Sequence, residues 1–121
     1  MEKCILVCVT VQRGCVELIR RGHEMALQTG AELHVLHVSG SKTLPGQKEN
    51  AEILDMLFSL ARETDAEMSV LYEEQDVAVA IARQAKELGA TTLILGQNRT
   101  GIVEKVRLLL PEGTALISIA P

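Results

Sequence analysis

The polar segment from Gly96 to Gly101 has the residue types and the spacing of an anion-binding loop. The apolar, β-branched run Thr91–Leu95 before it predicts a buried strand, and Ile102–Leu110 after it predicts a short helix that Pro111 stops. The first turn of a helix presents free N–H groups and the positive end of the helix dipole to the loop that precedes it. The spacing therefore predicts either an anion site or an ordinary strand-to-helix loop with a glycine at each end.

Three side chains within this loop could bind a phosphate group. Asn98, Arg99 and Thr100 all carry hydrogen-bond donors, and the guanidinium of Arg99 could donate to two phosphate oxygens at once. Gly96 would let the backbone approach such a ligand closely. The alternative is that Arg99 is a solvated loop cation, and the sequence alone does not separate these two interpretations.

The sequence lacks the motifs of the common nucleophilic and phosphate-transfer enzymes. It has no Gly-x-Ser-x-Gly elbow, no full Walker sequence and no Cys, His and carboxylate set at zinc-binding spacing. His34 and His37 fall on opposite faces of one predicted strand, so they cannot both bind one metal ion without distortion. We interpret His37 as a packed, hydrogen-bonded core histidine, with a place in the ligand pocket as the alternative. We therefore expect no catalytic residue and no metal site.

Length and composition limit the fold and the partners. The 121 residues, of which 47% are hydrophobic and 2% aromatic, predict one domain over residues 1–121 with an aliphatic core. The formal net charge of −4 argues against a nucleic-acid binder, and no apolar run approaches the roughly 20 residues that span a membrane. Cys4, Cys8 and Cys15 form no Cys-x-x-Cys motif and follow no signal peptide, so we expect buried, reduced thiols in a cytoplasmic protein.

The chain alternates apolar runs of strand length with segments of helical periodicity. The apolar face of the first predicted helix includes Ile19, His23 and Leu27. The alternation indicates an α/β fold, in which four helices flank a doubly wound, five-stranded parallel sheet. The predicted strands are Cys4–Val9, Leu33–Val38, Met68–Tyr72, Thr91–Leu95 and Ala115–Ile119, and the predicted helices are Cys15 to a stop at Gly30, about Ala51–Glu63, about Asp76–Leu88, and Ile102–Leu110.

A doubly wound sheet binds its ligands beyond the carboxyl ends of the strands, where the strand order reverses. With the order 3-2-1-4-5, the reversal lies between the first and the fourth strand. The loops Thr10–Gly14 and Gly96–Gly101 would meet there, and Val38 and Ser39 would form a side wall. The last strand, Ala115–Ile119, would lie at a sheet edge, where its apolar register invites pairing with another chain. The alternative is that the Pro121 end only blunts this edge.

Three segments resemble the signature regions of the universal stress protein family: ILVCVT at 5–10, GAELHVLHV at 30–38 and TTLILGQNRTG at 91–101. The resemblance covers essentially the whole chain. The stretch LIRRGHEMALQTGAELHVLHV is similar to a compact variant of the domain inside potassium-responsive osmosensing histidine kinases. The resemblance implies an adenine-nucleotide alpha-hydrolase-like fold, a homodimer through the last strand, and a signalling protein as partner.

The nucleotide-binding branch of that family ends its first strand with an aspartate and wraps the phosphates of ATP in a Gly-x2-Gly-x9-Gly-Ser/Thr motif. Thr10 occupies the aspartate position here, so it offers a hydroxyl but no charge. Gly96 matches the first motif glycine, whereas the second falls on Arg99. The last glycine and its Ser/Thr fall on Leu109 and Leu110. Half of the phosphate cradle is therefore absent, and we do not expect the standard tight binding of ATP.

The resemblance and the altered motif lead to three hypotheses. The first is a non-catalytic regulatory or sensing module that binds ATP, AMP or cyclic di-AMP weakly. The second is a protein-interaction module that binds no nucleotide and acts through its sheet edge and helix faces. The third, ranked last, is an ATP hydrolase. The nucleotide-binding residues that the first hypothesis expects are Thr10, Val38, Gly96, Asn98, Arg99, Thr100 and Gly101.

Overall fold

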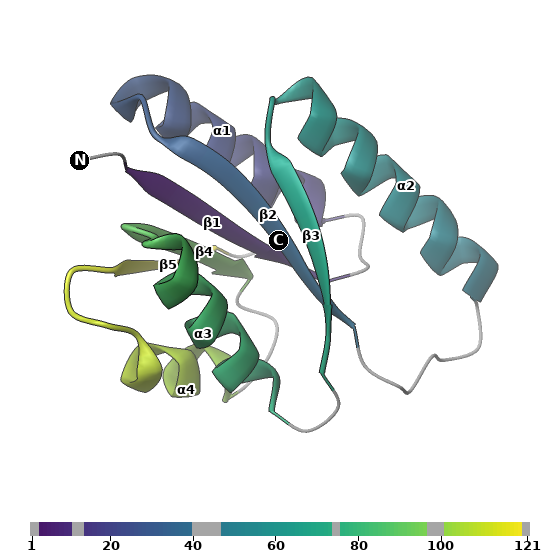
Figure 1. Ribbon diagram of the computed structural model, residues 1–121. Helices are drawn as coiled ribbons and strands as arrows, with labels where there is room; N and C mark the ends of the chain where they lie inside the picture. The colour runs from purple at the N-terminus through teal and green to yellow at the C-terminus, as the bar shows by residue number, and fades with distance from the viewer. Residues whose placement is uncertain (1–2, 11–13, 40–46, 74–75, 97–100, 120–121) are drawn as a thin grey trace.

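The computed structural model describes residues 3–10, 14–39, 47–73, 76–96 and 101–119. Within these ranges five strands alternate with four helices (Figure 1). None of the helices in these ranges combines the length and the apolar character that crossing a bilayer requires. The strands are β1 (Cys4–Val9), β2 (Glu32–Ser39), β3 (Glu67–Tyr72), β4 (Thr92–Gly96) and β5 (Ala115–Ile119), and the helices are α1 (Cys15–Thr29), α2 (Gln47–Glu63), α3 (Val77–Leu88) and α4 (Ile102–Leu109).

The sheet is parallel throughout and has the order β3-β2-β1-β4-β5, which confirms the predicted doubly wound topology. The helices α1 and α2 lie on one side of the sheet, and α3 and α4 lie on the other (Figure 1). The chain first builds outward from β1 to β3, and then returns to place β4 on the other side of β1. The strand order therefore reverses between β1 and β4, as predicted.

Strand β1 is buried on both faces and separates two apolar cores. Ile5, Val7 and Val9 belong to the core beneath α1 and α2, whereas Leu6 and Cys8 belong to the core beneath α3 and α4. Successive side chains of a strand point to opposite faces, so a central strand covered by helices on both sides is apolar at every position. This burial explains the uninterrupted apolar run from which the strand was predicted.

The buried face of α1 differs from the predicted one. Leu27, which was expected on the apolar face, is 72% exposed, so this part of the prediction was wrong. The residues that α1 buries are Cys15, Leu18, Ile19 and Gly22. A rule based on apolar side chains gives no weight to a glycine. At Gly22, however, the helix approaches the sheet so closely that an added Cβ atom would lie 2.6 Å from Cγ2 of Val7.

Two element boundaries also differ from the prediction. Helix α2 begins at Gln47, four residues before the predicted Ala51. The prediction started too late because the first turn of the helix is polar, and apolar spacing cannot detect a polar turn. Strand β4 is displaced by one residue, and its ladder with β5 extends to Gly96. The amide and the hydroxyl of Thr91 both donate to the carbonyl oxygen of Cys4, at 2.8 and 3.1 Å. Gly96 is therefore the last residue of a strand rather than the first residue of a loop.

Candidate functional site

Strands β1 and β4 lie side by side where the strand order reverses. Their register runs from the pair Ile5–Thr92 to the pair Val7–Ile94, and each strand continues for two further residues. Helix α1, which follows β1, packs on one face of the sheet, whereas α4, which follows β4, packs on the other. Parallel α/β sheets bind their ligands in the crevice that such a divergence creates.

Three of the predicted site residues lie at this carboxyl-terminal edge of the sheet. Thr10 directly follows β1, and Gly96 ends β4, and both are half-buried. Val38 is half-buried near the end of β2, one residue beyond the pair Val9–His37 with which the β1–β2 register ends. The tertiary structure therefore brings to one edge residues that are far apart in the sequence.

The other predicted site residues belong to the connection between β4 and α4. Gly101 is the N-cap of α4 and has a φ of 88°, a value that L side chains rarely adopt. A glycine at this end of the loop is therefore required by the backbone, whether or not an anion binds. Asn98, Arg99 and Thr100 lie outside the described residues, so their contacts with a phosphate stay a prediction.

Thr10 is held by the first residue of α1. Its backbone N–H donates to the Sγ atom of Cys15 at 3.3 Å, and its hydroxyl oxygen lies 3.6 Å from the same sulfur. Cys15 is buried and carries a free thiol. Sequence reasoning treated Cys15 only as a core residue, although its position five residues after Thr10, at a helix start, was visible in the sequence.

His37 is a buried, hydrogen-bonded histidine, which confirms the interpretation made from the sequence. Its Nδ1 atom lies 3.2 Å from the carbonyl oxygen of Val9. A carbonyl can only accept, so Nδ1 carries the hydrogen of this bond. The imidazole therefore contacts the backbone immediately before Thr10, and it supports the end of β1 from the neighbouring strand.

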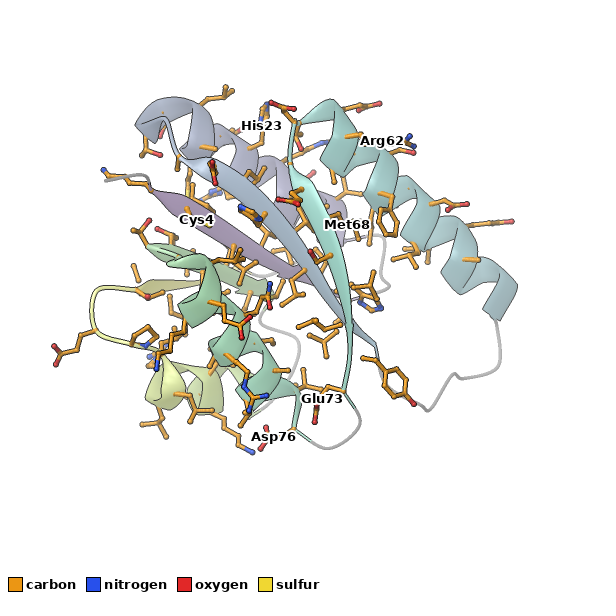
Figure 2. The ribbon with its side chains drawn as sticks, in the orientation of Figure 1. Cys4, His23, Arg62, Met68, Glu73 and Asp76 are labelled. Atoms are coloured by element: carbon orange, nitrogen blue, oxygen red, sulfur yellow. The ribbon has the colours of Figure 1, made fainter. Side chains whose placement is uncertain are left out.

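The cation in the first turn of α4 is engaged by α3. Lys105 Nζ lies 2.7 Å from Oδ2 of Asp76, the N-cap of α3, whose Oδ1 accepts from the backbone N–H of Val79 at 3.2 Å. The hydrogen bond from Lys105, followed by that from Val79, holds the pKa of Asp76 below its usual value. Figure 2 shows Asp76 at the start of α3. In this arrangement the Lys105 ammonium group links α4 to the start of α3, and its charge is paired with Asp76.

A separate pocket of about 460 Å³ lies at the opposite, amino-terminal edge of the sheet, and its lining includes His23 and His34. Within it, His34 Nε2 lies 3.5 Å from Glu32 and His34 Nδ1 lies 3.7 Å from Glu67. Sequence reasoning missed this pocket because its walls come from several elements. Within the described ranges, no group of three or more His, Cys, Asp or Glu residues is placed to hold a metal ion.

The chain is similar to a curated sensor protein over most of its length. No protein-family model matches the chain. A sensor protein named KdpD from Synechocystis sp. is 30% identical over 95 residues, which represent 78% of this chain and 25% of that protein. The chain therefore spans about a quarter of the length of the curated relative it matches.

Solved structures of universal stress proteins share the fold over nearly the whole chain. The universal stress protein from Archaeoglobus fulgidus in complex with dAMP matches with a TM-score of 0.72 and 19% identity, over 98% of each chain. A universal stress protein in complex with cAMP matches with a TM-score of 0.73 and 14% identity, over 98% of this chain and 97% of that one. The chain therefore has the universal stress protein fold, which confirms the expected adenine-nucleotide alpha-hydrolase-like architecture.

Proposed function

We propose that this chain is a regulatory module that binds an adenine nucleotide weakly and catalyses no reaction on it. The observation that carries the proposal is the gathering of Thr10, Val38 and Gly96 at the edge where the strand order reverses. Two proteins of the same fold are known in complex with dAMP and with cAMP. Doubly wound sheets commonly bind their ligands at this edge, beyond the carboxyl ends of the strands.

The described residues at this edge are uncharged, which suits weak binding of a nucleotide. Thr10 offers a hydroxyl where a carboxylate would add charge, and Gly96 offers close backbone approach without a side chain. The phosphate would be bound by Arg99 and Thr100 from the loop before α4. Because Lys105 is paired with Asp76, it adds no second cation there. We therefore propose a mononucleotide such as AMP as the preferred ligand, with ATP and cyclic di-AMP as alternatives.

Binding would act by shifting a conformational population. A ligand changes an equilibrium only by its difference in affinity for the two states, so the states must differ at the β1 and β4 ends that contact it. The surface changed in this way would be offered to a signalling protein, in keeping with the sensor protein that the chain resembles. Cys4, Cys8 and Cys15 are free thiols, which suits a reducing compartment such as the cytoplasm.

Thermal unfolding in the presence of AMP, cAMP, ATP or cyclic di-AMP tests the proposal. A ligand at 100 times its Kd stabilises the folded state by about 2.7 kcal/mol. We expect a concentration-dependent rise in Tm with an adenine mononucleotide, and we expect Arg99→Ala to reduce it. Arg62→Ala is the matched control, because Arg62 is exposed in the last turn of α2, which leads to the opposite edge of the sheet. No rise at millimolar concentrations of any of the four ligands would contradict the proposal.

A second candidate function is a protein-interaction module that assembles through β5. This strand forms one edge of the sheet, and Leu108 in the preceding helix is 86% exposed. An edge strand and exposed apolar side chains both favour contact with a second chain. The candidate predicts a homodimer through Ala115–Ile119 whose stability depends on protein concentration and not on nucleotide.

A further inference from the structure

The peptide group between Val9 and Thr10 is held at both of its polar ends by side chains from other elements. Its carbonyl oxygen accepts from Nδ1 of His37 in β2 at 3.2 Å. Its N–H donates to Sγ of Cys15 in α1 at 3.3 Å. Both of these side chains are buried. Because a peptide group is planar, fixing its oxygen and its nitrogen fixes the orientation of the whole unit.

This peptide lies where strand pairing gives way to the loop. The β1–β4 register ends at Val7, and the β1–β2 register ends at the pair Val9–His37. The Val9 carbonyl belongs to the last pair of the β1–β2 ladder, and the imidazole of His37 adds a hydrogen bond to it. The N–H of Thr10 lies beyond both registers, and the thiol of Cys15 accepts its hydrogen bond, so this donor is satisfied. We refer to His37, Cys15 and the peptide they hold as the Val9–Thr10 clamp.

We propose that His37 and Cys15 are positioning residues for the nucleotide site, because the clamp sets the direction in which Thr10 leaves β1. The proposal rests on the proposed function of this edge. The contact of 3.6 Å between the Thr10 hydroxyl and the Cys15 sulfur also turns that hydroxyl toward the first turn of α1. Neither residue needs to touch the ligand. Each acts through the backbone of a residue that lies at the site.

Paired substitutions separate the hydrogen bonds of the clamp from simple packing. Cys15→Ala removes the acceptor, whereas Cys15→Ser keeps an acceptor of similar size. His37→Leu removes the donor, whereas the side-chain amide of His37→Asn can place a donor near the position of Nδ1. Cys8→Ala is the matched control, since Cys8 is a buried thiol in β1 that packs in the other core.

Two measurements on the full chain test the clamp. The first is the Kd for AMP, measured by titration calorimetry for the wild type and the five variants. We expect Cys15→Ala and His37→Leu to weaken binding about tenfold, as the loss of one ordering hydrogen bond would. Cys15→Ser and His37→Asn should stay within about threefold of the wild type, and so should Cys8→Ala. A residue with a purely structural role would not give this rescue by the conservative variant.

The second measurement is hydrogen exchange at the Thr10 amide without ligand. Cys15→Ala should speed this exchange about tenfold more than Cys8→Ala does, because only Cys15 accepts a bond from that amide. If the wild type binds AMP and all variants bind equally well, the clamp proposal is overturned while the proposed function stands. If the wild type binds no nucleotide, the proposed function fails, and equal exchange in the two alanine variants would overturn the clamp as well.

Discussion

Gly22→Ala is the substitution whose effect depends most directly on the packing of α1 against the sheet. A Cβ atom at this position would lie 2.6 Å from Cγ2 of Val7 and 3.0 Å from Cδ1 of Leu33. Carbon atoms in proteins pack at about 3.5–4.0 Å, so Val7 or the helix would have to move by about 1 Å. Valine is stiff at χ1 and cannot easily turn its methyl group away. We therefore expect Gly22→Ala to destabilise the fold.

Two opposing effects determine the size of this loss. Alanine in a helix interior is favoured over glycine by about 1 kcal/mol. Overpacking a well-packed core costs about 1–3 kcal/mol, and the two short contacts place this site toward the upper end. The net expectation is a loss of about 1–2 kcal/mol in the free energy of unfolding. For a domain of this size, that loss lowers Tm by roughly 4–8 °C.

Urea unfolding of Gly22→Ala, Val7→Ala and the double variant measures the clash directly. Removing the Val7 methyl groups should relieve it, so the double variant should be more stable than the sum of the two single losses predicts. Gly30→Ala is the contrasting control, because Gly30 has a φ of 71° and open space around its Cβ position. Gly30→Ala should lose stability because alanine is strained at this positive φ, and Val7→Ala should not restore that stability. A Gly22→Ala variant more stable than the wild type, or additive losses in the double variant, would refute the reasoning.

Two further predictions concern the helix contacts and the sheet edge. The pKa of Asp76 is lowered chiefly by the hydrogen bond from Lys105. The ionised Asp76 carboxylate therefore contributes fully to stability above the ordinary carboxyl pKa of about 4, and this contribution is lost as the pH falls through the lowered pKa. Asp76→Asn, which keeps a capping oxygen, should flatten the stability curve between about pH 5 and 2, and an unchanged urea midpoint profile would contradict this assignment. For the edge, Ala115→Lys places a charge at the exposed start of β5 and should shift the sedimentation equilibrium toward monomer. Monomeric wild-type protein at all concentrations would remove the basis for a β5 dimer.

The sequence determined the order and type of the elements. Uninterrupted apolar runs such as Cys4–Val9 arise because a central parallel strand is buried on both faces, and this burial is written in consecutive residues. The alternation of strands with helices then restricts the connections to those of a doubly wound sheet. The reversal between β1 and β4 follows from this topology. Thr10 and Gly96 could therefore be assigned to one edge from the sequence alone.

Only the tertiary structure decided which side chains meet there. The apolar spacing of α1 suggested Leu27 as a core residue, but Leu27 is exposed and Gly22 is the residue that packs closely against Val7 of β1 and Leu33 of β2. The bond between His37 and Val9 joins residues 28 positions apart. Apolar periodicity indicates which face of a helix or strand is buried. It does not indicate which distant residue packs against that face or forms a hydrogen bond with it. The direction of the chain at Thr10 depends on such partners, and the sequence pattern alone could not supply it.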